Sequence, residues 1–299
     1  MKNHWTTENI PNLKGKTAIV TGSNSGIGFE TAKAIAAKGA RLNMAIRNID
    51  KGKKAADAIL KEFPDANIEV TDLDLSSLTS VRAFSESFIK ENQRLDFLIN
   101  NAGVMMPPYG TTVDGFELQF GTNHLGHFAL TGLLLPLLLR TKGSRVVNVS
   151  SYAHKAGKIN FDDLDSKQAY NKMAAYGQSK LANLLFTYEL QRRFENAGSN
   201  SLSTAAHPGW TETNLQQHSG GLRFLNPVLG QNPPMGALPT LRAATGTDAI
   251  GGDYYGPRGF MEMQGTPVKV KSNGLSHDID TARRLWDVSE ELTGVVFQF

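Results

Sequence analysis

Thr21-Gly22-Ser23-Asn24-Ser25-Gly26-Ile27-Gly28 joins an apolar run at 17–21 to a helical pattern at 27–38. In this strand-loop-helix context, the free amides and the dipole of the helix N-terminus face a bound pyrophosphate. The first glycine permits the tight turn, the second lets the backbone approach a phosphate, and the third allows the strand and the helix to pack closely. The spacing is Gly-x-x-x-Gly-x-Gly, not Gly-x-Gly-x-x-Gly, and a merely structural turn is the alternative. We therefore predict that residues 22–28 bind a dinucleotide.

Strand and helix patterns alternate along the rest of the chain. The expected strands are 17–21, 41–47, 68–73, 95–100, 145–150, 203–206 and one near Tyr254. The expected helices are 27–38, 51–63, 78–92, 115–139, 174–194 and 235–244. Apolar strands without alternation, such as Phe97-Leu98-Ile99, suit a sheet that is covered on both faces. The repeated units predict an α/β fold, in which residues 1–299 form a single doubly wound domain with a mostly parallel sheet of about seven strands and helices on both faces.

Composition excludes several classes of protein. The 299 residues include 31 lysines and arginines and 28 acidic residues, a formal net charge of +3, and no cysteine. This small excess of positive charge, without a long basic run, argues against nucleic-acid and anionic-membrane partners. The absence of cysteine removes disulfides and thiolate metal sites, and it fits a reducing compartment.

Neither a signal peptide nor a membrane span is expected. Residues 1–15 are polar and include Glu8, so they lack the apolar core of a signal peptide. The most apolar segment, 128–139, contains Pro136 and falls short of the ~20 residues that cross a bilayer. We interpret this segment as a buried helix and expect a cytoplasmic protein.

The end of the second expected strand bears on the choice of cofactor. An NAD site usually offers an acidic residue there, about 20 residues beyond the loop, to the ribose hydroxyl. This chain has Ile46 followed by Arg47, and a guanidinium can pair with a 2′-phosphate. We therefore predict NADP(H) rather than NAD(H), with an ordinary solvated role for Arg47 as the alternative.

A phenol and an ammonium lie four residues apart at Tyr176 and Lys180. On a helix this spacing stacks both side chains on one face, where the cation can stabilise a phenolate that otherwise forms near pH ~10. Such pairs are common, and packing is the alternative. The glycine loop, the Asn-Asn-Ala-Gly motif at 100–103 and the Ser150-Ser151 pair at a strand end favour a proton-transfer pair.

With these motifs the chain resembles the short-chain dehydrogenase/reductase family, and within it the retinol-dehydrogenase-like branch, which also includes light-independent relatives of protochlorophyllide reductase. The resemblance begins near Leu13 and runs to the last strand. The motifs in family order are 21–28, Asp74-Leu75, 100–103, Asn123, Ser151, 176–180 and Pro208-Gly209. The resemblance implies one NADP(H)-binding Rossmann domain and an oxidoreductase that transfers a hydride between NADP(H) and a carbonyl or alcohol, without a metal.

The resemblance implies four catalytic residues. Tyr176 would deliver the proton to the carbonyl oxygen, and Lys180 would hold the nicotinamide ribose and favour tyrosinate. Ser151 would donate a hydrogen bond to the carbonyl oxygen, with Ser150 as the second candidate. Asn123 would position a water that leads to the lysine, and an asparagine that only satisfies the backbone is the alternative.

The same resemblance implies further cofactor contacts. Asp74 would accept from the adenine amino group, and residues 101–103 would line the cofactor. Pro208-Gly209 and a threonine would bind the nicotinamide carboxamide, with Thr213 the better match and Thr211 the other candidate. The predicted cofactor contacts are Gly22, Ser23, Asn24, Ser25, Gly26, Ile27, Gly28, Arg47, Asp74, Leu75, Asn101, Ala102, Gly103, Tyr176, Lys180, Pro208, Gly209, Thr211 and Thr213. Capped loops and tight turns without a ligand are the alternative.

A variable stretch at 211–234 follows these motifs. It carries apolar residues among glycines, with Trp210 just before it. This composition suits a substrate lid over a lipophilic aldehyde or ketone, and packing on the core or on a partner subunit is an equal alternative. His124 and His127 lie three apart on one expected helix, but no third metal ligand presents itself, and we interpret them as packing residues.

Family members usually associate through the helices that carry Asn123 and Tyr176. The leucines expected on the outer faces of these helices are Leu133, Leu137, Leu184 and Leu185. A homodimer or homotetramer is therefore the expectation, and a monomer is the alternative within the branch. The rival function is a catalytically idle NADP(H)-binding redox sensor or scaffold, which the presence of the tyrosine, lysine and serine disfavours.

Overall fold

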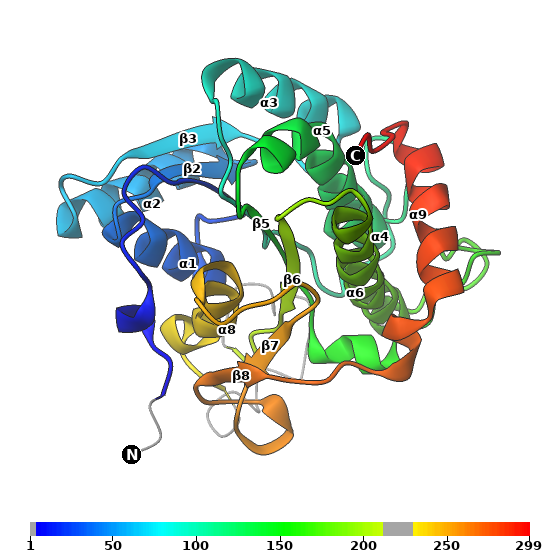
Figure 1. The fold of residues 1–299 in the computed structure, drawn as a ribbon. Coiled ribbons are helices and arrows are strands. Elements are labelled where there is room, and N and C mark those ends of the chain that lie inside the picture. The colour runs from blue at the N-terminus through cyan, green and yellow to red at the C-terminus, as the bar shows by residue number, and fades with distance from the viewer. Residues whose placement is uncertain (1–3, 212–229) are drawn as a thin grey trace.

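The structure, a computed structural model, describes residues 4–211 and 230–299. Its strands form one eight-stranded sheet in the order β3-β2-β1-β4-β5-β6-β7-β8 (Figure 1). Strands β1 to β7 pair in parallel, and β8 is antiparallel to β7. The strands are β1 (Thr17–Thr21), β2 (Arg41–Ile46), β3 (Ile68–Asp72), β4 (Phe97–Asn100), β5 (Arg145–Val149), β6 (Leu202–Ala206), β7 (Tyr254–Pro257) and β8 (Pro267–Lys269).

Helices cover both faces of the sheet, which confirms the predicted doubly wound α/β fold (Figure 1). The helices are α1 (Gly26–Ala37), α2 (Ile49–Glu62), α3 (Leu78–Glu91), α4 (Leu118–Phe120), α5 (Gly126–Arg140), α6 (Lys172–Asn196), α8 (Pro233–Thr245) and α9 (Ile279–Thr293). A π-helical turn, η2 (Gly121–Leu125), joins α4 to α5. The short 3₁₀ turns are η1 (Thr7–Asn9), η3 (Tyr152–Ala156), η6 (Phe260–Glu262) and η7 (Gly274–His277). Helices α1, α2 and α8 share one apolar cluster with the sheet, and α3, α5, α6 and α9 share another.

The central strands are apolar because they are covered twice. Every position of β1, β4 and β7 is buried. With helices on both faces, no side of these strands needs polar residues, so they are mostly apolar and show no alternation of apolar and polar positions. The sheet is therefore a rigid base, and the loops that leave its strand ends are held in fixed positions.

Local capping explains where the observed helices differ from the predicted ones. Helix α6 begins at Lys172, two residues before its predicted start, because Oδ1 of Asn171 accepts hydrogen bonds from the amides of Met173 and Ala174, each at 3.0 Å. An asparagine at this position satisfies amides that have no partner inside the helix. Strand β1 has the predicted bounds.

The C-terminal part of the chain contains two elements that were not predicted, β8 and α9. Helix α9 packs against α6 and α5 (Figure 1). Leu137, Leu184 and Leu185, predicted to face outward, are fully buried within the chain. Leu185 shares an apolar cluster with Leu285 of α9, and Leu184 shares one with Ala205 of the sheet. The predicted exposure of these three leucines is therefore wrong, because α9 and the sheet cover them.

Within residues 4–211 and 230–299, no helix combines the length and the apolarity that crossing a membrane requires. The most apolar segment forms α5, which runs through Pro136 and is buried at most of its positions. It lies between the sheet and α9, in the cluster that also holds Trp286. The predicted buried helix is confirmed.

Candidate active site

The predicted motifs meet at one edge of the sheet. The glycine loop follows β1, residues 101–103 follow β4, Ser151 lies just beyond β5, and Pro208-Gly209 lie just beyond β6. Because these strands are parallel, their carboxyl ends lie at the same edge, where doubly wound folds bind ligands. This edge is the candidate active site.

The glycine loop has a backbone that favours glycine. The φ angle is +63° at Gly22 and +58° at Gly26, in the left-handed region that other residues rarely adopt. A side chain at Gly28 would meet Nδ2 of Asn101 and the carbonyl of Gly22. Ser25, the N-cap of the 12-residue helix α1, makes no side-chain capping hydrogen bond. The start of α1 therefore fits the phosphates of a dinucleotide, which its amides can bind.

Thr21 ties the glycine loop to the loop after β4. Its Oγ1 accepts hydrogen bonds from the amides of Asn101 and Ala102, each at 2.9 Å, and lies 3.0 Å from Nε2 of His127. Nδ2 of Asn101 donates to the carbonyl of Thr21 at 2.8 Å. This role of Thr21 was not predicted, and its place at a strand end beside the first glycine was the only sign of it. Asn101 and Ala102 thus fix the two loops against each other.

Arg47 and Asp74 lie beyond the ends of β2 and β3. Arg47 is exposed directly after β2. Oδ1 of Asp74 accepts from the amide of Ser76 at 2.9 Å and from its hydroxyl at 2.7 Å. Leu75 is buried, with its carbonyl against Gly126. Asp74 therefore caps a loop, the alternative role considered for it, and among the described residues no hydrogen bond involves its Oδ2.

Helix α6 presents Tyr176 and Lys180 on one face, as their four-residue spacing predicts. Both side chains are buried, at 6% and 3% exposure. Nζ of Lys180 lies 5.7 Å from the centroid of the Tyr176 ring and donates to the carbonyl of Val149 at 3.0 Å. The ammonium is therefore held at the end of β5, two residues before Ser151.

Burial shifts the pKa of both groups toward their neutral forms. It raises the pKa of Tyr176 to about 12, although the hydrogen bond with Ser151 acts in the opposite direction. It lowers the pKa of Lys180 to about 8. Desolvation disfavours whichever form is charged, so Tyr176 is a phenol at neutral pH. That Lys180 favours tyrosinate stays a prediction, since burial is the dominant influence on Tyr176 here.

The two candidate serines differ in what their hydroxyls bind. Ser150 is buried, and its hydroxyl donates to the carbonyl of Lys180 at 2.8 Å. Ser151 is partly exposed, and its Oγ accepts from the amide of Ala153 at 3.2 Å. Ser151 also lies close enough to Tyr176 to act on the pKa of the phenol, which it lowers. Ser151 is therefore the better candidate to act with the phenol, because the hydroxyl of Ser150 is already bonded to backbone inside the protein.

Asn123 is fully buried in the π-helical turn η2, and such turns are frequent at functional sites. Its Oδ1 accepts from the amide of Val104 at 2.8 Å, and its Nδ2 donates to the Val104 carbonyl and to Oγ of Ser179, each at 3.0 Å. Ser179 donates to the carbonyl of Tyr176 at 2.8 Å. Asn123 thus connects the loop after β4 to the tyrosine helix. The Ser179 connection was not predicted, and the water-positioning role stays a prediction.

The segment after β6 forms a turn at the same edge of the sheet. Gly209 has a φ of +66°. The hydroxyl of Thr211 donates to the carbonyl of Pro208 at 2.7 Å, which closes the turn. Thr213 lies outside the described residues, as do positions 212–229 of the predicted lid at 211–234. Before this turn, Nε2 of the buried His207 lies 2.8 Å from Oε2 of Glu262, a pairing that was not predicted.

His124 and His127 pack inside the chain, as predicted. Nε2 of His124 lies 3.0 Å from Oγ of Ser289, and Nδ1 of His127 lies 3.0 Å from the carbonyl of Asn123. Burial lowers the pKa of His124 to about 3 and that of His127 to about 4. In the part of the chain that the structure describes, no group of three or more His, Cys, Asp or Glu could hold a metal ion.

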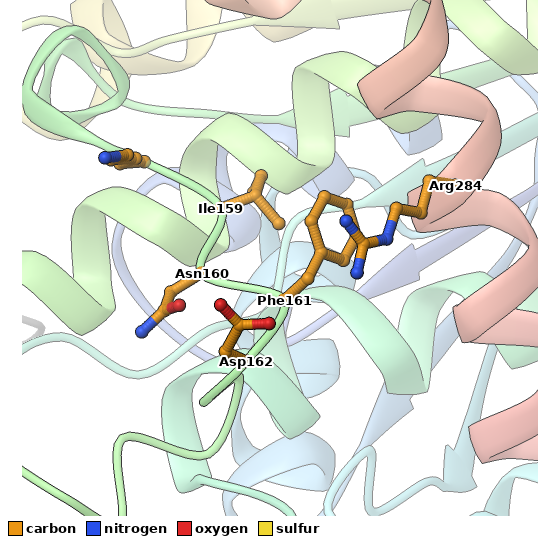
Figure 2. A pocket seen from close by; sticks show the side chains of 6 residues that line it. Ile159, Asn160, Phe161, Asp162 and Arg284 are labelled. Atoms are coloured by element: carbon orange, nitrogen blue, oxygen red, sulfur yellow. The ribbon is translucent and has the colours of Figure 1, made fainter.

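A separate hollow of about 420 Å³ lies between the loop 158–162 and α9 (Figure 2). The guanidinium of Arg284 lies over the ring of Phe161, 4.0 Å from its centroid. None of the residues that line this hollow belongs to the predicted motifs. It is therefore distinct from the candidate active site.

Comparison with known proteins identifies the relatives of this chain. The family described as short chain dehydrogenase matches residues 16–221. The chain belongs to this family. Human retinol dehydrogenase 12 is 44% identical over 289 residues, which cover 95% of this chain and 88% of that protein. Human retinol dehydrogenase 11 is 42% identical over 288 residues, which cover 95% of this chain and 87% of that protein.

A solved structure has a closely similar fold. The protein, an uncharacterized one from Mycobacterium paratuberculosis, is 43% identical and has a TM-score of 0.85, and the alignment covers 99% of this chain and 100% of that chain. The short-chain dehydrogenase described here belongs to the retinol-dehydrogenase-like branch. It is therefore an oxidoreductase that acts on alcohol or carbonyl groups with a nicotinamide dinucleotide.

Proposed function

We propose that this short-chain dehydrogenase interconverts a carbonyl and an alcohol with NADP(H), and that Tyr176 transfers the proton. The observation that most supports this is that Tyr176 and Lys180 share a buried helix face at the carboxyl edge of the sheet, with Ser151 close enough to the phenol to lower its pKa. A redox sensor or scaffold would need the glycine loop but not these three groups in one place. The enzyme is therefore the better-supported function.

The residues at this edge fit a bound dinucleotide. The glycine loop and the start of α1 would hold the pyrophosphate, and residues 101–103 would line the cofactor beside β4. Lys180, the turn at Pro208-Gly209 and a threonine, Thr213 or Thr211, would hold the nicotinamide half. When bound, the cofactor supplies or accepts the hydride.

Arg47 supports a preference for NADP(H). It is exposed at the end of β2, directly after apolar Ile46, where an NAD site would offer a carboxylate. Among the described residues, no ion pair or hydrogen bond engages its guanidinium, which is therefore free to pair with a 2′-phosphate.

Tyr176, Ser151 and Lys180 would share the work of proton transfer. With a pKa of about 12, Tyr176 is a phenol at neutral pH and gives its proton to the carbonyl oxygen during reduction. The hydroxyl of Ser151 donates a hydrogen bond to the same oxygen as negative charge develops there. With a pKa of about 8, Lys180 is mostly charged at pH 7 and stabilises the phenolate that is left. Asn123 would hold the loop and the helix in register.

We propose a lipophilic substrate. The relatives at 42% and 44% identity are retinol dehydrogenases, named for retinol, an apolar alcohol. The apolar residues predicted at 211–234 follow the turn beside the site, which suits an apolar pocket.

Serine and tyrosine variants test the proposal together. With NADPH and a panel of aldehydes and ketones, Tyr176→Phe should lower kcat by about 10²- to 10⁴-fold, because general acid catalysis is lost. Ser151→Ala should lower it by about 10²- to 10³-fold. Ser150→Ala is the matched control and should keep turnover near that of the wild type, because its hydroxyl faces α6 backbone.

Fluorescence titration with NADPH separates binding from turnover in these variants. NADPH should bind Tyr176→Phe nearly as well as it binds the wild type. Wild-type-like turnover in Tyr176→Phe would contradict the mechanism. NADPH binding by the wild type without turnover of any carbonyl or alcohol would favour the idle sensor.

A further inference from the structure

The turn at residues 259–263, which contains η6, lies at the active edge of the sheet. It follows β7, which is parallel to β6, so it leaves the sheet at the edge where Ser151 and Pro208 lie. The carbonyl of Met263 accepts from the amide of Trp210 at 2.9 Å. A side chain at Gly209 would meet the carbonyls of Met263 and Glu262. The turn is therefore packed on the segment proposed to hold the nicotinamide.

The backbone of this turn is strained. Met261 has a φ of +50° and Glu262 a φ of +58°, and left-handed backbone at two successive residues other than glycine is rare because the Cβ atom crowds the carbonyl. Strain of this kind persists only where the surroundings impose it, and it clusters at ligand sites. The turn is closed by hydrogen bonds from the amide of Gly259 to the carbonyl of Gln264 at 2.8 Å and from the amide of Glu262 to the carbonyl of Gly259 at 2.9 Å.

Glu262 anchors the turn to two segments of the site. Its Oε2 accepts from Nε2 of His207 at 2.8 Å, and its Oε1 lies 3.5 Å from Nζ of Lys155. Nδ1 of His207 accepts from the amide of Gly209 at 3.3 Å, so the proton of the imidazole lies on Nε2 and points to the carboxylate. Lys155 belongs to η3, which Ser151 caps. Glu262 thus connects the turn to the ends of both β5 and β6.

The tip of the anchored turn is apolar and exposed. Phe260 is 84% exposed and Met261 is 48% exposed. Single exposed apolar residues are ordinary on protein surfaces. Here two exposed apolar residues are adjacent, and they lie on a strained turn that His207 and Lys155 hold at the ligand-binding edge. Contact with a ligand explains this arrangement better.

We propose that the turn at 259–263 forms one wall of the substrate entrance, where Phe260 and Met261 contact the apolar chain of the substrate and determine specificity for its length. Glu262 is a positioning residue, which holds this wall through His207 and Lys155. The inference rests on the proposed function, since it names the part of the molecule that recognises a lipophilic carbonyl or alcohol.

A chain-length series tests this inference. Initial rates with NADPH and butanal, hexanal, octanal or decanal give kcat/KM for the wild type and for the double variant Phe260→Ala/Met261→Ala. Each methylene group buried against the wall should raise kcat/KM by about fourfold. The double variant should therefore lower kcat/KM for decanal by about tenfold or more, the effect of roughly two methylene groups, and leave that for butanal nearly unchanged. Ile250→Ala, at an exposed residue before β7 and so at the opposite edge, is the matched control and should change neither.

Variants of Glu262 test the anchor separately. Glu262→Ala should reduce the decanal-to-butanal ratio of kcat/KM, and Glu262→Gln should restore most of it, because the amide oxygen still accepts from His207. A purely structural role would lower the rates with both aldehydes equally and leave the ratio unchanged, which would refute the positioning role.

The outcomes separate this inference from the proposed function. If the wild type turns over no carbonyl or alcohol, the proposed function fails and this inference fails with it. If the wild type prefers decanal and the double variant keeps that preference, the proposed function stands and the wall is refuted. A wild type with equal kcat/KM for butanal and decanal also refutes the wall.

Discussion

Replacing Lys180 with methionine should stabilise the unliganded protein at neutral pH. The ammonium is buried, and burial lowers the pKa of Lys180 from its ordinary 10.5 to about 8. The folded state therefore disfavours the charged form of Lys180, which the unfolded chain keeps. The resulting loss of folding free energy is fully present below pH 8 and disappears as the pH rises through 10.5. From these two pKa values, the cost is about 3 kcal/mol at pH 7, about 2 kcal/mol at pH 9 and about 1 kcal/mol at pH 10.

Methionine has a side chain of similar length without the charge, so it avoids this cost. It also loses the hydrogen bond from Nζ to the carbonyl of Val149, which contributes about 1 kcal/mol. That carbonyl stays paired, because Nδ2 of Asn183 donates to it at 3.2 Å. The net gain in the free energy of unfolding should be about 2 kcal/mol at pH 7.

Urea unfolding at pH 7, 9 and 10, without added cofactor, measures this gain. Lys53→Met is the control, because Lys53 is exposed in α2 and its loss should change stability by less than about 0.5 kcal/mol at each pH. The advantage of Lys180→Met should shrink by about 2 kcal/mol between pH 7 and pH 10. A variant that is less stable than the wild type at pH 7, or an advantage that does not depend on pH, would refute the reasoning. Turnover should be lost in the same variant, since Lys180 is proposed to stabilise the phenolate.

Three further outcomes are expected. Arg47→Ala should weaken NADPH binding by about tenfold to a hundredfold in fluorescence titrations and leave NADH binding unchanged; equal effects on both would contradict the NADP preference. Initial rates of alcohol oxidation, which needs Tyr176 as a phenolate, should increase from pH 7 to pH 10, whereas carbonyl reduction should not; parallel pH profiles would contradict the assigned role. The side chain of Asp96 is 2% exposed and forms ion pairs with Lys16 and Arg94. Burial alone would raise the pKa of Asp96, but the hydrogen bonds from Arg94 and Thr17 lower this pKa below 3.8. The stability that Asp96 contributes is thus present above pH 3.8 and is lost as the pH falls below it. Urea unfolding should show that Asp96→Asn lowers the free energy of unfolding by about 1–3 kcal/mol at pH 7 and by less at pH 3.

The sequence predicted the parallel part of the fold closely because burial on both faces gives parallel strands an unmistakable composition. Strand β1 has the predicted bounds, and α1 lies one residue from its predicted position. The antiparallel β8 has only three residues and begins with Pro267, so no local pattern marked it. The sequence did contain one sign of helix α9, an aspartate at 278, which is a residue type that often caps a helix start. In the structure its side chain accepts from the amide of Thr281.

Which helix faces are covered could not be predicted from local sequence. The local sequence pattern around Leu185 does not distinguish packing against a partner subunit from packing against another part of its own chain. Its cover comes from α9, about a hundred residues further along the chain, where Leu285 shares its cluster. The direction of burial is set by the tertiary arrangement, which periodicity does not encode.

The residues of the candidate site also fall into those that could be predicted from the sequence and those that could not. Tyr176, Lys180 and Ser151 were predicted because motif spacing follows the chain and each motif ends a strand or opens a helix. Glu262 was not predicted, because it meets His207 from 55 residues away and has no motif of its own. Contacts between separate loops depend on where the sheet places the loops, so they become visible only in the folded chain.

The pKa shifts of Tyr176 and Lys180 are opposite in sign, have one cause, and bear on the direction of the proposed reaction. Burial keeps Tyr176 protonated, with a pKa of about 12, while Lys180, with a pKa of about 8, stays mostly charged at pH 7. The protein at neutral pH therefore meets a carbonyl with the proton already in place, whereas alcohol oxidation must first ionise a phenol, which costs about 7 kcal/mol over five pKa units. The equilibrium between carbonyl and alcohol depends on the cofactor pool and not on the protein. Reduction needs Tyr176 as a phenol and oxidation needs it as a phenolate, and at pH 7 nearly all of the unliganded protein has the phenol. We therefore expect carbonyl reduction to be the faster direction at pH 7.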